Sequence, residues 1–266
     1  MVRKIGIDLG TTNLLICLDN KGVIVDEPSV ITVDASSKKC IAAGLDAREM
    51  LGRTPKNMLC IRPLKDGVVA DFEATDMMLN YFLKKCELKG MFKKNIILIC
   101  HPTKITSVEK NAIRDCAYRA GAKKVYLEEE PKVAAVGAGL DIGKASGNMV
   151  LDIGGGTSDI AVLSLGDIVC STSIKTAGNR ITQDIIENVR SKRKMYIGEQ
   201  TAEEIKQKIG NAMVVKDAET ISVSGRDVET GLPHAIEINS NEVESYIRGS
   251  LQEIVHATKT ILEVTP

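Results

Sequence analysis

Short apolar runs separated by polar turns dominate the first part of the chain. Up to Val33 this pattern predicts strands, and over about residues 30–71 it becomes shorter and includes a turn at residues 62–67, which suggests an inserted subdomain. An apolar stripe then predicts a helix over residues 75–88, formed by Met77, Met78, Tyr81, Phe82 and Leu88.

Strands and helices alternate from residue 95 onward. Asn95–Cys100 is a continuous apolar run typical of a buried strand, and Thr106 with Glu109 forms a capping-box pattern that predicts the start of a helix. Similar patterns predict a strand over residues 124–127 and helices over residues 133–140 and 185–193. This alternation is typical of an α/β fold.

The last quarter of the chain carries two further capping signals. Thr201–Glu204 predicts a helix that ends at Gly210, and Ser240–Asn241 predicts a long helix that ends near Glu263. Between these helices lie two short predicted strands, at residues 221–223 and 235–238.

Composition narrows the range of partners. The chain has 266 residues, enough to bury one or two cores, and its 35 Lys and Arg balance 35 Asp and Glu. A neutral chain with 3% aromatic residues and no Trp lacks both the basic surface and the stacking platforms that nucleic-acid-binding proteins use. We therefore expect no nucleic-acid partner.

The cysteines indicate a reducing compartment. The seven cysteines form no Cys-x-x-Cys pair and most lie inside apolar runs, so we expect reduced core thiols rather than disulfides or a zinc site. No apolar run is long enough to cross a bilayer, and the N-terminus has no signal-peptide core. These features predict a soluble, cytoplasmic protein.

One motif occurs twice: an apolar run, an Asp, a turn rich in Gly and hydroxyl groups, and a second apolar run. In the first copy Asp8 precedes the turn at residues 10–13, and in the second Asp152 precedes the turn at residues 154–157. The two aspartates lie 144 residues apart, about one domain length, which suggests two related domains that each contribute a hairpin to a shared cleft.

The residue types in these turns suit phosphate. Each turn joins strand to strand, which separates it from the Rossmann fingerprint, in which the glycines open a helix. Backbone N–H groups of a Gly-rich turn can converge on an anion, and the hydroxyls of Thr11, Thr12 and Thr157 add donors. The alternative is a pair of tight hairpins whose Asp and Gly serve turn geometry alone. Because the motif with Asp, Gly and Thr occurs twice, we favour the phosphate interpretation.

An aspartate beside each turn indicates a divalent cation. Asp8 and Asp152 would repel a phosphate, unless a cation lies between the charges. Mg²⁺ is commonly held by carboxylates, waters and substrate phosphates together. We therefore predict that Asp8 and Asp152 organise Mg²⁺.

With both hairpins identified, the chain resembles the actin–Hsp70–sugar-kinase superfamily. Asp-Leu-Gly-Thr-Thr-Asn at residues 8–13 is similar to its first phosphate motif, and Asp-Ile-Gly-Gly-Gly-Thr-Ser-Asp at residues 152–159 to its second. Other stretches resemble, within that superfamily, the MreB/Mbl family of bacterial actins: residues 27–30, 50–55, 61–72, 129–131, 137–140, 202–210 and 239–242. The resemblance covers essentially the whole chain.

The resemblance implies an α/β, actin-like ATPase fold, with duplicated ribonuclease-H-like domains around a nucleotide cleft. The domains would span residues 1–142 and 143–266, with small inserted subdomains at about 30–71 and 179–240. Family chains continue beyond Pro266, so we expect the second domain to lack its C-terminal part, including a Gly-rich adenosine loop. Asn179 and Thr182 depart from a family pattern that is more acidic there, and we expect weaker ATP binding and turnover.

The resemblance also implies roles for individual residues. Phosphates would lie between Thr11, Thr12 and Asn13 on one side and Gly155, Gly156 and Thr157 on the other. A helix carrying Glu203, Glu204, Ile205 and Lys206 would line the adenosine, although a solvated helix explains that stretch equally. Glu130 would orient the attacking water; it also suits a helix start followed by Pro131.

A possible membrane contact lies at Met91 and Phe92, two large apolar residues flanked by several lysines. Such a loop suits an anionic membrane surface, and some family members insert a similar loop. The alternative is that both side chains fold back onto the core.

The resemblance implies an ATP- and Mg²⁺-binding cytoskeletal protein. It would polymerise into filaments at the inner face of the cell membrane, direct cell-wall synthesis with the elongation machinery, set rod shape, and turn over ATP weakly. Alternatives are an Hsp70-like chaperone ATPase, a sugar kinase, or a truncated remnant that binds partners without hydrolysis. No substrate-binding domain follows the ATPase region, and no second catalytic Asp can be named, which disfavours the first two.

Overall fold

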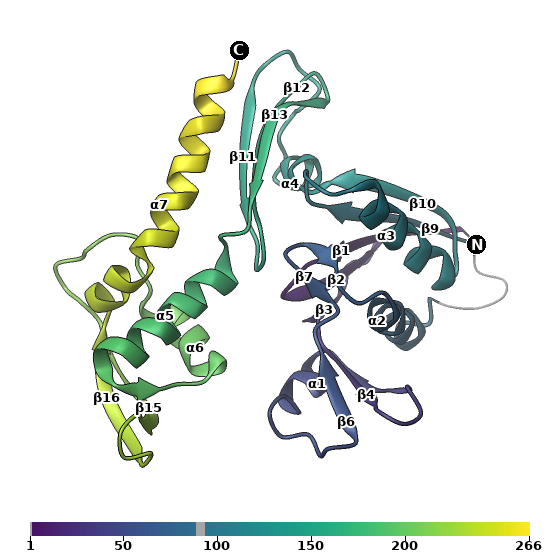
Figure 1. Ribbon diagram of the computed structural model, residues 1–266. Coiled ribbons are helices and arrows are strands. Elements are labelled where there is room, and N and C mark those ends of the chain that lie inside the picture. Colours follow the sequence, from purple (N-terminus) through teal and green to yellow (C-terminus); the bar gives the residue numbers. More distant parts are fainter. Residues whose placement is uncertain (1, 89–93) are drawn as a thin grey trace. The chain divides into compact units, whose positions relative to one another are not determined.

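The structure is a computed structural model that describes residues 2–88 and 94–266. The chain divides into two compact units (Figure 1). Unit 1 comprises Met1–Ser173 with Thr265–Pro266, and unit 2 comprises Ile174–Val264. Both phosphate-type turns lie in unit 1, and the predicted division into domains after residue 142 stays a prediction.

Unit 1 is built on a five-stranded mixed sheet with the order β10-β9-β1-β2-β3. The strands are β1 (Val2–Leu9), β2 (Asn13–Leu18), β3 (Gly22–Pro28), β9 (Lys94–His101) and β10 (Ala122–Glu129). β1 pairs antiparallel with β2 and parallel with β9. Alternate residues of β1 (Ile5, Ile7 and Leu9) are buried, so this strand turns one apolar face toward the core.

Two capped helices supply the other side of that core. In α2 (Phe72–Lys85) the Asp71 side chain accepts a hydrogen bond from the Ala74 N–H, and α3 (Ser107–Arg119) starts with the capping box predicted at Thr106 and Glu109. Fully buried side chains of α2 form one cluster with those of the sheet, including Met78, Leu79, Phe82 and Leu83. The sheet is thereby fixed against the helices.

Smaller elements complete unit 1. A separate three-stranded sheet has the order β5-β4-β6 and lies with α1 (Leu45–Glu49) in the lower part of Figure 1. Its strands are β4 (Ile31–Asp34), β5 (Cys40–Ala43) and β6 (Met58–Ile61), and a short hairpin, β7 (Leu64–Lys65) and β8 (Val68–Val69), follows. A second three-stranded sheet contains β11 (Asn148–Ile153), β12 (Ser158–Ser164) and β13 (Asp167–Ile174), and α4 (Glu130–Gly137) contacts β11 and β12.

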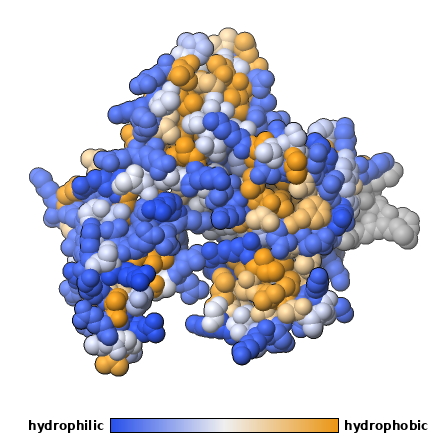
Figure 2. All heavy atoms as spheres, in the orientation of Figure 1, coloured by the Kyte–Doolittle hydropathy of each residue, from blue (hydrophilic) through white to orange (hydrophobic). Residues whose placement is uncertain are grey.

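Unit 2 packs three helices on a sheet of order β14-β15-β16. Its elements are α5 (Gly178–Arg193), β14 (Met195–Tyr196), α6 (Glu199–Ile209), β15 (Thr220–Asp227), β16 (Pro233–Asn239) and α7 (Ser240–Val264). The buried side chains of α5, α6 and α7 form one apolar cluster with Val223 and Ile238 of the sheet. The surface of this lobe that Figure 2 shows is mostly hydrophilic.

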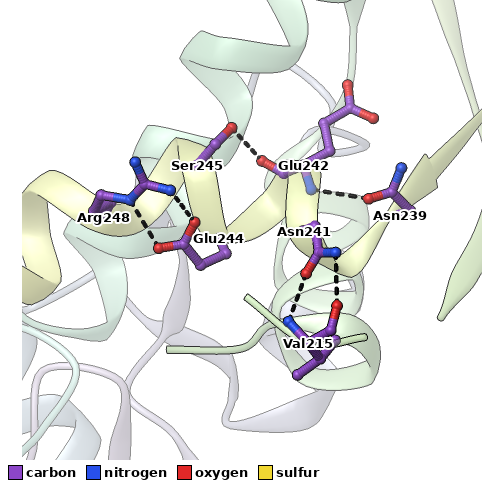
Figure 3. Close-up of polar contacts among 7 residues, drawn as sticks. All are labelled: Val215, Asn239, Asn241, Glu242, Glu244, Ser245 and Arg248. Carbon is purple, nitrogen blue, oxygen red and sulfur yellow. Dashed lines mark hydrogen bonds and ion pairs between the residues drawn. The ribbon is translucent and has the colours of Figure 1, made fainter. Parts of the chain in front are cut away.

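The start of α7 is held by side-chain amides (Figure 3). Asn239 accepts a hydrogen bond from the Glu242 N–H, and Asn241 both donates to and accepts from the backbone of Val215, at 2.9 Å each. Glu244 and Arg248 pair one helical turn further on. The helix therefore begins at Ser240 as predicted, but the prediction that Ser240 and Asn241 cap it is wrong, because the side chain that accepts from the first turn is that of Asn239.

Several predicted boundaries are wrong by up to seven residues. Helix α2 begins at Phe72 because Asp71 is its N-cap, and α5 begins at Gly178 rather than at Ile185. Helix α6 begins at Glu199 after Gly198, so Thr201 lies inside the helix and does not cap it. A helix can start before the first residue of an apolar stripe, since polar residues also occupy its first turn.

The prediction of core thiols is wrong for most cysteines. All seven thiols are free, but only Cys116 is buried. Cys17 is exposed and the other five are half-buried. An apolar run does not distinguish the two faces of a strand, and Cys17 and Cys100 lie on the less buried face of the main sheet.

We predict that Phe82→Ala destabilises unit 1. Phe82 is fully buried and makes an edge-to-face contact with Tyr81 at 5.3 Å. Its truncation leaves a cavity in the main core, and we expect a loss of about 3–5 kcal/mol in the free energy of unfolding, measured by urea denaturation. Val108→Ala is the control, because Val108 is 77% exposed. Equal losses in the two variants would contradict this view of the core.

Candidate functional site

The turns of the two motifs lie against each other in unit 1. A Cβ atom on Gly155 would lie 1.8 Å from Oγ1 of Thr12, and one on Gly156 would lie 2.6 Å from Oγ1 of Thr11. The backbone of the second turn therefore contacts the side chains of the first. Only glycine leaves room for this approach, which explains the residue type at both positions.

Ser29 holds the first turn in place with two hydrogen bonds. It is fully buried, its hydroxyl donates to the Gly10 carbonyl at 2.6 Å, and its N–H donates to the Thr12 carbonyl at 2.8 Å. Sequence reasoning missed this role. Ser29 lies within the family-type stretch at residues 27–30, but a serine there carries no signal for a partner in the preceding hairpin.

The β7–β8 hairpin forms a third side of the site. Its turn residues, Asp66 and Gly67, have φ values of 51° and 75°, as a tight hairpin requires. The Gly67 N–H donates to the Thr11 hydroxyl at 2.8 Å, and a Cβ on Gly156 would lie 3.0 Å from the Asp66 Cα. In this hydrogen bond the Thr11 hydroxyl is the acceptor, and its contact with an anion stays a prediction.

Carboxylates accumulate behind the turns. Burial raises the pKa of Asp8 to about 6, with a further contribution from the charge of Asp152. Burial also raises the pKa of Asp152, and Asp159, its partner across the β11–β12 pair, adds to that effect. Each of the two aspartates therefore has a higher affinity for protons, or for another cation, than an exposed one.

Glu130 shares this environment. It is the first residue of α4, and burial raises its pKa to about 8, with contributions from Asp159, Asp8 and Asp152 in that order. Pro131 follows it and is buried, as the sequence suggested for a helix start. At neutral pH, and with no cation nearby, Glu130 is therefore mainly protonated.

Asp159 is the acidic residue that sequence reasoning missed. It is 1% exposed and accepts hydrogen bonds from the N–H and hydroxyl of Thr103, at 3.0 and 3.1 Å, and from the Ser173 hydroxyl at 3.2 Å. The last residue of the second motif is thereby tied to the loop after β9 and to β13. The sequence signal for Asp159 was its position as the last residue of the second phosphate motif, residues 152–159.

This arrangement fits a divalent cation that is shared with a ligand. In residues 2–88 and 94–266, no group of three or more Asp, Glu, His or Cys side chains is arranged to hold a metal ion without other ligands. Mg²⁺ keeps several waters and takes phosphate oxygens, so it needs few protein carboxylates. Asp8 and Asp152, whose pKa values are both raised by burial, remain the predicted pair.

Asn13 and Thr157, the other predicted phosphate contacts, already take part in hydrogen bonds within the protein. Asn13 donates from its amide to Asp26 at 2.9 Å. Thr157 is 9% exposed, and its carbonyl accepts the Gly154 N–H at 2.9 Å, which closes the second turn. Both remain at the rim of the two turns, and their contact with a ligand stays a prediction.

The predicted adenosine residues lie on α6, in unit 2. The Lys206 ammonium has three acceptors: Glu203 at 2.6 Å, the Thr182 hydroxyl at 2.9 Å and the Gly178 carbonyl at 3.0 Å. These contacts join α6 to the first turn of α5. Ile205 is fully buried in the unit 2 core, and Glu204 pairs with Lys208. All the contacts named here lie within unit 2, and a role in nucleotide binding stays a prediction.

The predicted membrane residues, Met91 and Phe92, lie outside the described residues. Within the part of the chain that the structure describes, no helix has the length and apolar character needed to cross a membrane.

We predict that Gly155→Ala separates the two turns. The added Cβ would overlap the Thr12 side chain, and we expect a loss of about 2 kcal/mol or more in the free energy of unfolding. Gly147→Ala is the control, because its Cβ would meet nothing closer than 3.9 Å. Thr12→Gly in the Gly155→Ala background should recover part of the loss. If it recovers none, the overlap is not the cause.

We predict that Glu130→Gln makes stability less dependent on pH. The pKa of Glu130 is about 8 in the folded chain and 4.5 for an exposed glutamate, so the parent loses stability as pH rises between these values. The variant lacks this loss and should exceed the parent at pH 8 by about 2 kcal/mol in urea denaturation. Glu219→Gln, at an exposed position, should follow the parent. Identical profiles for Glu130→Gln and the parent would contradict the burial of this acid.

Comparison with known proteins agrees with the geometry. The profile of the MreB/Mbl protein family matches residues 2–266. The chain is 54% identical over 264 residues to the cell shape-determining protein Mbl of Bacillus subtilis, covering 99% of this chain and 79% of the relative. It is 44% identical over 269 residues to the cell shape-determining protein MreB of Escherichia coli K12, covering 99% and 78%.

Solved structures show the same fold. MreB5 of Spiroplasma citri bound to ADP superposes with a TM-score of 0.93 at 36% identity, covering 100% of this chain and 80% of that one. The MamK double helical filament gives a TM-score of 0.80 at 19% identity, covering 100% and 81%, a likeness of fold alone. The predicted actin-like ATPase fold is confirmed. Residue motifs, fold and relatives agree, and the chain belongs to the MreB/Mbl family.

Proposed function

We propose that this protein binds ATP with Mg²⁺ and assembles into filaments that guide cell-wall synthesis. The observation that carries the proposal is the contact between two glycine- and hydroxyl-bearing turns, next to half-buried carboxylates with raised pKa values. Relatives named cell shape-determining proteins, and MreB5 structures bound to ADP and to AMPPNP, support it.

Phosphate binding would use donors from both turns. The hydroxyls of Thr11 and Thr12 and the backbone N–H groups of Gly155 and Gly156 lie at one rim of the site. Asp8 and Asp152 would hold Mg²⁺, directly or through waters. The cation, when bound, neutralises charge on the phosphates and fixes their orientation. Thr157, Asn13 and the α6 residues Glu203–Lys206 would complete the contacts with the nucleotide.

Glu130 would act on the attacking water. Its high pKa arises partly from repulsion by Asp8 and Asp152. Burial and Asp159 raise this pKa most, and a cation beside Asp8 and Asp152 would offset their share of the repulsion and favour the ionised carboxylate of Glu130. An ionised carboxylate can accept a hydrogen bond from water and orient it for hydrolysis. The weak ATPase activity would thus depend on occupancy of the site.

Filaments follow from self-contacts that do not close on themselves. ATP would favour assembly and hydrolysis would loosen it, and the MamK double helical filament shows that this fold supports such polymers. We further propose a cytoplasmic location at the inner membrane face, with Met91 and Phe92 as the membrane contact and the wall-elongation machinery as partner. This part rests on the sequence and on the names of the relatives.

We predict that Asp152→Ala removes Mg²⁺-dependent ATP binding from the 266-residue chain. In isothermal titration calorimetry, we expect the parent to bind ATP more tightly with Mg²⁺, and the variant to lose at least about tenfold in affinity, because one of the two cation-binding carboxylates is missing. ATP-dependent sedimentation of the parent then tests filament assembly.

The control is Asp217→Ala, which removes an exposed carboxylate from unit 2 and should not change binding. Equal affinity of Asp152→Ala and the parent in Mg²⁺ would contradict the metal assignment. A folded parent that binds no ATP would favour the second candidate, a remnant that binds partners without nucleotide.

A further inference from the structure

Unit 2 carries a concentration of positive charge at the end of α5. Four of the five residues from 190 to 194 are Lys or Arg, in a chain with no net charge. Cations at a helix C-terminus stabilise the helix, which accounts for Arg190, Lys192 and Arg193 in its last turn. It does not account for Arg226, which lies on β15 and, like Arg190, contacts the ring of Tyr196.

Tyr196 brings the two elements together. The guanidinium carbon of Arg190 lies 5.0 Å from the centre of the Tyr196 ring, and that of Arg226 lies 5.5 Å from it. Tyr196 and Arg226 are direct partners across β14 and β15. The two guanidiniums are therefore at most about 10 Å apart, a distance that three residues of an extended chain span.

These cations are exposed and lack carboxylate partners. Arg190, Lys192, Lys194 and Arg226 are all exposed. Among the described residues, Arg193 pairs with Glu242 at 3.6 Å, whereas those four make no ion pair. Lys192 instead lies over the ring of Tyr246, at 4.7 Å. The aromatic rings hold the cations in place without neutralising them.

We propose that this surface, formed by Arg190, Lys192, Lys194, Tyr196 and Arg226, binds an acidic peptide segment of a partner protein. Two fixed guanidiniums match carboxylates two or three residues apart on an extended chain. Beyond Arg226 the same face of β15 and β16 carries the exposed small side chains of Ser224 and Ala235, which leave room for a peptide backbone. Because the cations are already oriented, little side-chain entropy is lost on binding.

Nucleic acid fits this surface less well. Base stacking needs an accessible aromatic face, and two guanidiniums already lie over the Tyr196 ring.

The test is fluorescence anisotropy with the full chain and a labelled peptide of alternating Glu and Ser, about twelve residues long, at about 50 mM salt. We expect the parent to bind and Arg190→Gln/Arg226→Gln to bind about tenfold more weakly. Tyr196→Phe should keep the affinity, whereas Tyr196→Leu, which frees the guanidiniums, should lose about threefold.

The matched control is Lys216→Gln/Lys259→Gln, which removes two exposed cations elsewhere in unit 2 and should leave affinity within about twofold. No binding by the parent, or equal losses in the two double variants, would overturn the proposal. The same would follow if phosphatidylglycerol vesicles or single-stranded DNA bind through Arg190 and Arg226 while the peptide does not. Circular dichroism of each variant confirms that it remains folded.

Discussion

Electrostatic repulsion among buried acids is the constraint on which the candidate site depends. Burial raises the pKa values of Asp8, Asp152 and Glu130 in unit 1, and the charges of neighbouring aspartates, including Asp159, raise them further. These acids lie on β1, α4, β11 and β12, so the packing of four elements keeps like charges close together. The folded chain needs positive charge there, from protons or from a cation.

Close packing of backbone against side chain sets the second condition. Gly155 and Gly156 contact Thr12 and Thr11, and the hydrogen bond from Gly67 fixes the Thr11 hydroxyl. The groups proposed to bind an anion and those proposed to bind a cation are thereby held at neighbouring positions in the folded chain. Such preorganisation limits the entropy that binding must remove.

What the sequence predicted well was local or repeated. The Thr106–Glu109 capping box depends on residues three apart, and the two turns were found because their pattern recurs, so both could be identified without a structure. The missed features depend on contacts across the fold. Ser29 reaches the preceding hairpin, and Asp159 reaches Thr103, 56 residues away. No local pattern marks such partners.

The predictions of helix boundaries and of buried strand faces were wrong for a related reason. Helix α6 starts at Glu199 although Thr201 offers a better cap, because the Ala202 N–H already bonds to the Gly198 carbonyl and Thr201 lies inside the first turn. Cys17 lies in an apolar strand but on its exposed side, since burial depends on what covers each face of the sheet. Tertiary packing, which a single sequence does not display, decides the second case.

The contact between Ser173 and Asp159 has a consequence for Glu130. Ser173 ends the long segment of unit 1, and unit 2 begins at the next residue. Its hydroxyl helps to position the carboxylate whose charge contributes most, after burial, to the proton affinity of Glu130. The last residue before unit 2 thus contributes one hydrogen bond to the acid that, after burial, most raises the pKa of Glu130.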